Sequence, residues 1–600
     1  MARSPASILL APTAWIGIAI LGAFVAFWSG AVNATVPDPY LDEVFHVRQA
    51  QKYIDGKYLE WDPKITTPPG LQSYALSTVL SWATGLSSTA SLRAINAFLL
   101  PCLILIVLHM ESKLKKTETA LDVSSDNDAE VDQHPHATHQ IHVAFNIALF
   151  PPLFFFSALY YTDIAAVISV LLCWNHFLHC HDGGYPSVVQ DLTTVLLGLF
   201  SLTFRQTNIF WVFIFPAAIL LISRIDVGLD DPEGKEEILA DPPVREAYAD
   251  GTDYLFFIMS IVQRLCRVAQ LSLSGRYAYS KLIRLLTPYA VILASFAAFV
   301  VWNGGVVLGD KSNHIATIHL PQMLYIWPYI LFFSYPLCYP YLAQGTFHLL
   351  SSLTVLAPLE ANLMFKRKQV LPRIVLLVGF AGIAGIVIYY NTIVHPFTLA
   401  DNRHYMFYIF RLLTRYRITK FLVIPIYLIG AWAIIQALGA PAQLRLHSAD
   451  KNLSPDQNSQ LSSSSSAKDK SDPASATPLR LNLAVAREGA PVSFVLIWLV
   501  TATLNLVTAP LVEPRYFIIP WIMWRLRVPR AGEADTAKVV ARKGDKSWSA
   551  IVSRAWVQHD RRLWVESAWF LLVNAVTGYI FLYRGFEWAQ ERERVQRFMW

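Results

Sequence analysis

The chain has 600 residues, of which 54% are hydrophobic and 15% are charged, with a net charge of +6 and a mean hydropathy of +0.39. A soluble protein carries about 25% charged residues, so this deficit excludes an ordinary soluble enzyme and predicts a surface that largely faces lipid. The modest positive charge is typical of basic cytosolic loops rather than of nucleic-acid binding, and the five cysteines lack the paired spacing of a zinc site or a disulfide framework.

Apolar segments long enough to cross a bilayer recur along the chain and predict an all-α polytopic membrane protein with about 12–14 transmembrane helices. The first segment, which follows Arg3, is too long for a signal-peptide core and is expected to remain as a helix. The remaining count stays open because residues 70–90 and 345–364 are ambiguous. The expected spans are residues 13–32, 92–110, 142–160, 161–181, 188–204, 207–224, 284–303, 321–344, 372–391, 418–437, 490–510, 512–526 and 563–584.

Three hydrophilic segments interrupt this pattern within one transmembrane domain that covers residues 1–600, namely residues 111–140, 225–283 and 441–487. Their Ser, Asp and Lys content is too polar to bury a core, so we expect cytosolic loops or inserts that are partly disordered. Histidines gather at residues 134–142 and 176–181, where we interpret them as solvated or interfacial side chains rather than as metal ligands.

The distribution of basic residues predicts an orientation. Placing the basic residues at positions 3, 113–116, 224, 366–368 and 525–530 in the cytosol puts six polar motifs on the opposite side. These are PDPYLDEVFH (37–46), YYTD (160–163), FRQTN (204–208), GDKSNH (309–314), ADNRHY (400–405) and VEPRYF (512–517). Polar motifs at one set of helix ends indicate a shared cavity. Arg411, Arg415, Arg417 and Lys420 fall on that side against the rule, so either they contact an anionic lipid group or a span nearby is miscounted.

The first extramembrane loop, residues 33–91, carries the densest set of reactive side chains. Asp42 and Glu43 begin a short helix whose apolar stripe suits a membrane surface. The turn at Asp55 and Gly56 and a proline-rich stretch at residues 63–70 then stiffen the chain. Such a loop is suited to holding a polar substrate above a membrane.

Sugar transfer from a phosphate-linked donor needs a carboxylate base, cations for the departing phosphate, and aromatic or polar groups that hold the sugars. Asp42 or Glu43 is the candidate base. Candidate cations are His46, Arg48, Lys64, Arg205, Arg403, His404 and Arg515. Candidate sugar-binding residues are Trp61, Tyr160, Tyr161 and Tyr516. Non-catalytic roles are the alternatives for these residues: a solvated acidic pair at Asp42 and Glu43, a helix cap at Asp163, and arginines that extend to the membrane interface.

Several of these motifs resemble those of a known family. YLDEVFHVRQAQKY, WDPKITTPPGL, YYTD, FRQTN, HPFTLADNRHY, RYFIIP and the final RFMW resemble, in the same order, the endoplasmic-reticulum α-1,2-glucosyltransferases that add the last glucose to the lipid-linked precursor of N-glycans. The resemblance runs from near residue 37 to residue 600 and departs mainly in the Ser-rich insert and in Pro514 before Arg515.

The resemblance implies a GT-C type glycosyltransferase in the endoplasmic-reticulum membrane, with its active site facing the lumen. It implies dolichyl-phosphate-glucose as donor, a diglucosylated dolichyl-diphosphate oligosaccharide as acceptor, inversion at the anomeric carbon, and no metal cofactor. The base maps best onto Asp42, with Glu43 as its rival. The matched motifs add Asp62, Asp163, Gln206, Asn208, Asp401 and Tyr405 to the expected substrate-binding residues.

Two other functions compete with this one. A related dolichyl-phosphate-sugar transferase, α-1,3-glucosyl or mannosyl, would use the same chemistry. A transporter or channel would instead place ionisable residues near the middle of its spans and use broken helices in repeated halves, and we find no such repeat.

Overall fold

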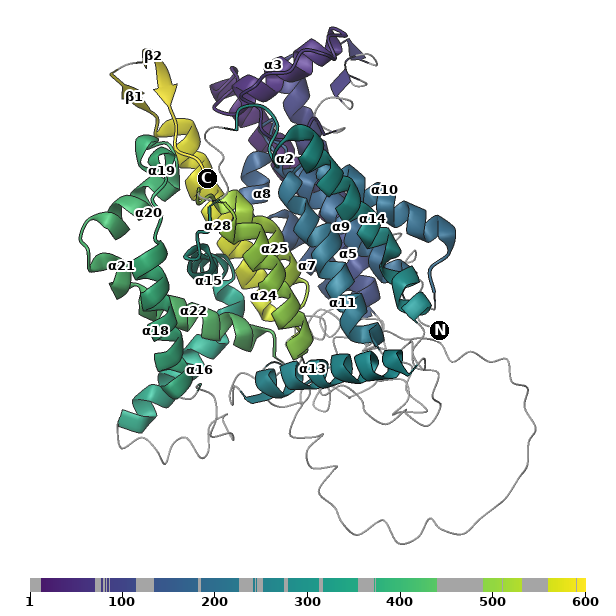
Figure 1. Cartoon of the computed structure of the whole chain (residues 1–600). Helices are drawn as coiled ribbons and strands as arrows, with labels where there is room; N and C mark the ends of the chain where they lie inside the picture. The colour runs from purple at the N-terminus through teal and green to yellow at the C-terminus, as the bar shows by residue number, and fades with distance from the viewer. Residues whose placement is uncertain are drawn as a thin grey trace, which may run out of the picture.

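In the computed structural model the polypeptide is almost entirely helical, apart from one small hairpin (Figure 1). The structure describes residues 12–70, 87–114, 134–181, 185–225, 252–274, 279–311, 317–353, 374–439, 489–509, 511–530, 559–589 and 591–600, with a few isolated residues between them. Most of the three predicted inserts and part of the GDKSNH motif lie outside these residues. The expected all-α polytopic architecture is confirmed.

Within the described residues, nine helical segments are long and apolar enough to cross a membrane. They are α2 (Pro12–Thr35), α5 (Thr89–Leu114), α9 (Asp163–Cys180), the run of η1 (Gln206–Asn208), η2 (Phe210–Ile214) and α11 (Phe215–Arg224), α13 (Thr252–Leu273), α14 (Tyr279–Asn303), α18 (Ile374–Asn391), the run of α21 (Thr419–Leu422) and α22 (Ile424–Ala437), and α28 (Arg561–Tyr583).

Shorter helices complete the bundle and its upper end in the view of Figure 1. The bundle also contains α7 (His134–Ala148), α8 (Pro151–Phe156), α10 (Val188–Leu202), α15 (Gln322–Phe333), α16 (Tyr335–Leu353), α24 (Val492–Val507) and α25 (Ile518–Arg525). Outside it lie α3 (Glu43–Ile54), α19 (Pro396–Ala400), α20 (Tyr405–Thr414), η5 (Pro514–Phe517), and the antiparallel strands β1 (Phe586–Trp588) and β2 (Glu591–Gln596).

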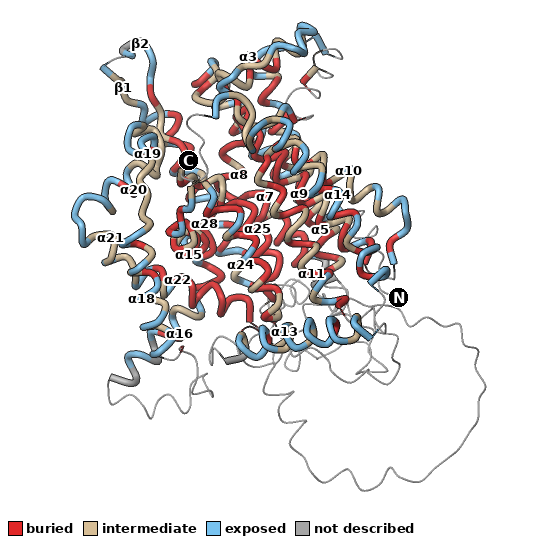
Figure 2. The backbone as a smooth tube through the Cα atoms, viewed as in Figure 1, coloured by how far each residue is buried: buried red, intermediate tan, exposed pale blue. Residues whose placement is uncertain are grey.

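Helix α13 meets the length and composition of a span but runs across the ends of the other helices (Figure 1). Phe257 is its buried anchor and packs against Val492 at the start of α24. Much of the rest of its apolar surface is exposed, including Phe256 and Met259 (Figure 2). These features are typical of an amphipathic helix in the plane of a membrane surface, and the placement of residues 225–283 in a cytosolic loop stays a prediction.

Two expected spans are divided. The segment 142–160 is split into α7 and α8, and Pro151 and Pro152 occupy the first turn of α8, where the amide hydrogens that they lack are not needed. The segment 321–344 is split at Ser334 into α15 and α16, and the Ser334 hydroxyl accepts a hydrogen bond from the indole of Trp521 at 2.8 Å. Both interruptions therefore have a local cause, a proline pair in one and a hydrogen-bonded serine in the other.

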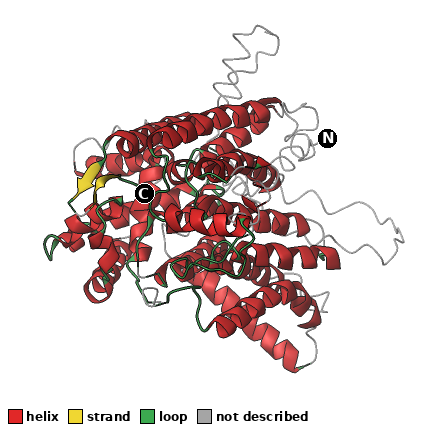
Figure 3. Cartoon of the chain, turned by 90° about the horizontal axis from the view of Figure 1, so that it is seen from above, coloured by secondary structure: helices red, strands yellow, loops and turns green. Residues whose placement is uncertain are grey.

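The core lies where α5, α7, α9, α24 and α25 pack, and it is the buried region of Figure 2. It is rich in aromatic rings, such as Phe150 stacked on Trp521 with centroids 3.7 Å apart. Above it, in the view of Figure 1, loops cross the helix ends, and the view from above in Figure 3 shows β1 and β2 at the margin of the helical body, close to the C-terminus. Five of the six polar motifs and the described residues 309–311 of the sixth gather at this end, as the sequence predicted.

Candidate active site

Asp42 and Glu43 are neighbours in sequence but lie in different environments. Leu41 precedes them with a left-handed backbone (φ 53°), which is unusual for a residue other than glycine and costs about 1–2 kcal/mol. Helix α3 starts immediately afterwards, and successive helical residues point about 100° apart. Glu43 is 0% exposed, whereas the Asp42 side chain is 50% exposed. The two candidate bases are therefore physically distinct.

The Glu43 carboxylate accepts four hydrogen bonds. Its Oε1 accepts from Arg93 Nε at 2.9 Å and from the Tyr160 amide at 2.6 Å. Its Oε2 accepts from an Arg93 terminal nitrogen at 2.6 Å and from the Tyr40 amide at 3.0 Å. Two carboxylate oxygens offer about four lone-pair sites, so these donors occupy the whole acceptor capacity of Glu43.

Arg93 is the residue of this site that the sequence reading missed. It projects from α5, is 0% exposed, and donates to Asn33 Oδ1 and to the carbonyl oxygens of Val36 and Asp38 as well as to Glu43. The ion pair thus ties the start of the first loop to a transmembrane helix. A charged residue inside the apolar run SLRAINAFLL was the available signal, since charges within spans are costly and usually paired.

Asp42 faces positive charge. Its Oδ2 lies 3.3 Å from a terminal nitrogen of Arg515, and its backbone amide donates to the Tyr161 hydroxyl at 3.3 Å. The Asp42 side chain is half exposed, yet the surrounding protein removes enough water from its carboxyl group to raise the pKa. The Arg515 guanidinium, with smaller contributions from the His46 and His404 side chains, outweighs that effect and holds the pKa below its ordinary value. Asp42 is thus a charged, reachable carboxylate at neutral pH.

Arg515 connects Asp42 to two further acids. Its other nitrogens contact Glu513 at 2.7 and 3.0 Å, and it lies 3.7 Å from Asp163. Asp163 in turn pairs with Arg205 at 2.9 Å and is 2% exposed. The Arg515 guanidinium also lies 5.3 Å from the Tyr161 ring centroid. The VEPRYF, YYTD and FRQTN motifs therefore form one charged network beside Asp42.

The proline-rich part of the first loop is clamped from two sides. Gln206 donates to the Thr66 carbonyl at 2.7 Å, and the Leu308 amide donates to the same carbonyl at 3.1 Å. The Asp310 amide donates to the Pro63 carbonyl at 2.7 Å. Gly309 makes this approach possible, because it has φ +64° and a Cβ there would lie 2.2 Å from the Pro63 oxygen. The loop is thereby held rigid beside the charged network.

The ADNRHY motif reaches the site through His404 rather than Arg403. Arg403 is paired with both oxygens of Asp401 at 2.7 and 2.8 Å and stacks 4.6 Å from the Trp588 ring. His404 approaches Asp42 closely enough to lower its pKa, and its Nδ1 lies 3.2 Å from the Trp600 backbone oxygen. Arg403 thus braces the loop, whereas His404 contacts the Trp600 backbone and contributes to the lowered pKa of Asp42.

The remaining predicted residues divide between the site and its supports. Lys64 lies 5.2 Å from the Phe45 ring, and Tyr516 lies 5.6 Å from the Arg205 guanidinium, so both border the site. The other five do not meet Asp42 directly. Arg48 is exposed, Asp62 closes a local turn with the Lys64 amide, Trp61 packs below α3, Tyr160 bonds Ser77, and Asn208 is buried against Ser201.

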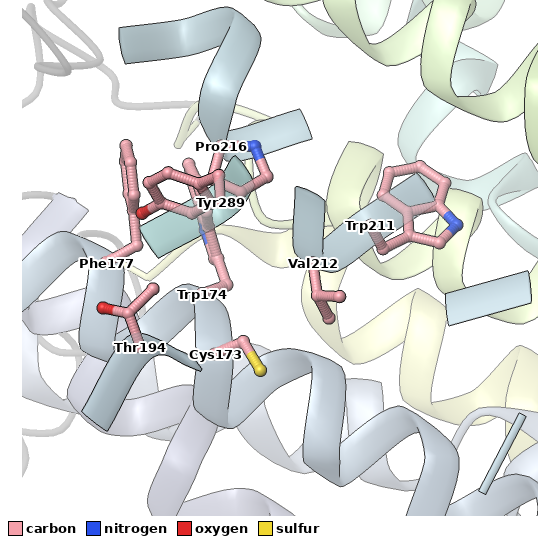
Figure 4. Close-up of a pocket in the computed structure, with 8 residues that line it drawn as sticks. All are labelled: Cys173, Trp174, Phe177, Thr194, Trp211, Val212, Pro216 and Tyr289. Carbon is pink, nitrogen blue, oxygen red and sulfur yellow. The ribbon is translucent and has the colours of Figure 1, made fainter. Parts of the chain in front are cut away.

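One other place invites a ligand but lies away from the six motifs. A small pocket between α9, α10, η2–α11 and α14 contains none of the six motifs (Figure 4). It is lined by Cys173, Trp174, Phe177, Thr194, Trp211, Val212, Pro216 and Tyr289. Across the part of the chain that the structure describes, no three His, Cys, Asp or Glu side chains come together to hold a metal ion. The Asp42 network is therefore the candidate active site.

Comparison with known proteins finds a matching family and relatives that share one name. A model of the DIE2/ALG10 family matches residues 36–526. Relatives from Aspergillus fumigatus and Emericella nidulans are each 38% identical, covering 96% of this chain and 96% of their own. A mouse relative is 29% identical over 95% of both chains. All three are named Dol-P-Glc:Glc(2)Man(9)GlcNAc(2)-PP-Dol alpha-1,2-glucosyltransferase.

Among solved structures, the chain is similar to the apo oligosaccharyltransferase of Archaeoglobus fulgidus, with 12% identity over 93% of this chain and 64% of that one. The TM-score is 0.24, which supports no conclusion about this chain.

Proposed function

The chain belongs to the DIE2/ALG10 family, as its motifs predicted, and we propose that it transfers glucose from dolichyl-phosphate-glucose to Glc(2)Man(9)GlcNAc(2)-PP-dolichol, with Asp42 as the general base. The relatives' shared name supports the reaction. The observation that supports the base is the contrast between the two acids: Glu43 is buried and fully hydrogen-bonded, whereas Asp42 is half exposed beside cations.

The proposed reaction is a single displacement. Asp42 accepts the proton of the 2-hydroxyl of the terminal acceptor glucose, and that oxygen attacks C1 of the donor glucose. The bond from C1 to the phosphate oxygen breaks, and its electron pair leaves with dolichyl phosphate, which gains one negative charge. Attack from the face opposite the leaving group inverts the β-linked donor into an α-1,2 product.

Cations beside Asp42 are suited to the departing phosphate. Arg515 and His404 both lie close enough to affect Asp42, and Arg205 extends the row through Asp163. Charge-assisted hydrogen bonds from guanidinium groups stabilise a phosphate that gains charge in the transition state. The acids around Arg515 hold its guanidinium in a fixed position before substrate binds, so little reorganisation is needed during transfer.

Replacement of Asp42 tests this assignment. The Asp42→Asn enzyme, purified in detergent, is expected to fold normally and bind donor but to transfer glucose about 10²–10⁴-fold more slowly, the usual contribution of a general base. The assay uses synthetic dolichyl-phosphate-glucose and the diglucosylated acceptor and reads the linkage of the product. Transfer at the wild-type rate would overturn the role of Asp42, and a product with another linkage would overturn the proposed reaction.

We further propose that the first loop faces the lumen of the endoplasmic reticulum. Support comes from the basic residues at the opposite helix ends and from the six motifs gathered at this one. The tip of the loop provides a reporter, because Lys57 and Leu59 are exposed and Lys57→Asn with Leu59→Thr creates an N-glycosylation sequence.

A glycan on this doubly substituted protein, removable by an N-glycosidase, is the expected result. The native sequence Asn452-Leu453-Ser454 in the 441–487 insert is the matched control and is expected to stay unmodified on the cytosolic side. The reverse pattern would invert the proposed orientation.

A further inference from the structure

Residues 596–600 build part of the site, although more than 550 residues separate them from the first loop. The Met599 amide donates to the Arg403 carbonyl at 2.9 Å, and the Tyr405 amide donates to the Met599 carbonyl at 3.2 Å. On the other side, the Tyr40 hydroxyl donates to the Arg597 carbonyl at 2.8 Å. The segment therefore lies between the ADNRHY loop and the first loop.

The side chains of this segment enter the protein interior. Met599 is 1% exposed and packs in the same cluster as Tyr161, whose ring lies beside Arg515. The Trp600 ring packs against Phe333 of α15 and Tyr405 of α20, with centroids 5.5 and 5.1 Å apart. Trp600 thus closes an aromatic wall next to His404.

Two hydrogen-bond donors in this aromatic wall are unsatisfied among the described residues. The indole Nε1 of Trp600 and the hydroxyl of Tyr405 are buried and have no hydrogen-bond partner among the described residues. Buried donors are satisfied in the great majority of cases, and each exception calls for an explanation such as a bound ligand or water. Here the two donors belong to rings that contact each other, and both lie next to His404, whose Nδ1 lies 3.2 Å from the Trp600 backbone oxygen.

We propose that the Trp600 indole N–H and the Tyr405 hydroxyl donate hydrogen bonds to phosphate oxygens of the lipid-linked glucose donor, a role that rests on the proposed function. A phosphate offers acceptor oxygens, whereas these two groups offer donors. The surrounding rings of Phe333, Trp600 and Tyr405 provide the apolar contact that the first isoprenoid units next to the phosphate require.

The test removes each hydrogen-bond donor while keeping an aromatic ring at the position. Trp600→Phe and Tyr405→Phe are each expected to raise the KM for dolichyl-phosphate-glucose about 10- to 100-fold, the range for a hydrogen bond to a charged group. The KM for the acceptor and the thermal unfolding midpoint are expected to stay near wild type. Dolichyl monophosphate, which carries no glucose, is expected to lose affinity as an inhibitor to the same extent.

Trp569→Phe is the matched control, because the Trp569 indole already donates to the Phe332 carbonyl at 2.8 Å and its loss is expected to leave the donor KM unchanged. An unchanged donor KM in both Trp600→Phe and Tyr405→Phe would show that the two groups serve a bound water, and the proposal would fail. That failure would leave the proposed function intact provided that wild type still transfers glucose and Asp42→Asn does not. Absence of transfer by wild type would instead overturn the proposed function.

Discussion

Replacing Glu43 with glutamine separates a structural acid from a catalytic one. Glutamine keeps one acceptor oxygen but puts an amide donor where Glu43 now accepts two N–H groups, so two of its four hydrogen-bonding contacts become repulsive. The substitution also leaves the Arg93 guanidinium charged at 0% exposure without its counter-charge. Both effects act on the folded state before any substrate binds.

The size of the effect follows from this burial. Removing one partner of a buried ion pair costs about 3–5 kcal/mol, because the remaining charge stays desolvated. A typical protein has about 5–15 kcal/mol of total stability, so the loss is a large part of what is available. We therefore expect Glu43→Gln to lower the thermal unfolding midpoint strongly and to lose activity in proportion to the folded protein that remains.

The assay measures unfolding and glucose transfer on the same purified samples. Asp42→Asn is the control, since its half-exposed carboxylate is expected to affect transfer and not unfolding. Glu43→Leu combined with Arg93→Met, which leaves no unpaired buried charge, is expected to unfold at a higher temperature than Glu43→Gln alone. A Glu43→Gln protein that unfolds like wild type yet transfers no glucose would refute this reasoning and move the general base to Glu43.

Three further results are expected. Gly309→Ala should weaken the clamp on the first loop and lower transfer, because a Cβ at φ +64° would meet the Pro63 oxygen. Gly305→Ala is the control and should not lower transfer, because the atom nearest to its Cβ would be 3.4 Å away. Equal activity of the two variants would contradict this reasoning. The acid limb of the pH–rate profile should lie below the ordinary aspartate pKa of about 3.9, because cations lower the pKa of Asp42. Arg515→Gln removes one cation that lowers the Asp42 pKa while burial still raises it, so the acid limb of the profile should move to higher pH. An acid limb that does not move would argue against Asp42 as the titrating group. EDTA should leave transfer unchanged, since arginines supply the positive charge, and a rate restored by added metal would contradict that expectation.

The sequence predicted which motifs meet but not how the acids within them differ. Periodicity and charge placed Asp42 and Glu43 at the start of the same short helix, and both remained candidates for the base. Their distinction depends on Arg93, which comes from another helix and fills the acceptor sites of Glu43. No local pattern contains that information, because the contact joins residues 50 positions apart.

The arginines were predicted as one class, yet tertiary contacts divide them. Arg515 touches Asp42, Asp163 and Glu513, whereas Arg403 is neutralised by Asp401 and stacks on the β1 strand. Sequence places both near the membrane surface but cannot give the direction in which a long side chain turns. Prolines and tertiary packing also divide two apolar segments, residues 142–160 and 321–344, that hydropathy reads as continuous.

The hydrogen bonds between Tyr40 and Arg597 have a consequence for biosynthesis. Because 557 residues separate the two, and ribosomes add about 5–20 residues per second, roughly half a minute to two minutes pass before the first loop meets its last partner. During that interval the first loop is already made while the wall formed by residues 596–600 does not yet exist. A newly made chain therefore gains this wall only after residues 596–600 have been made, and a chain that stops before them carries the first loop without its partner.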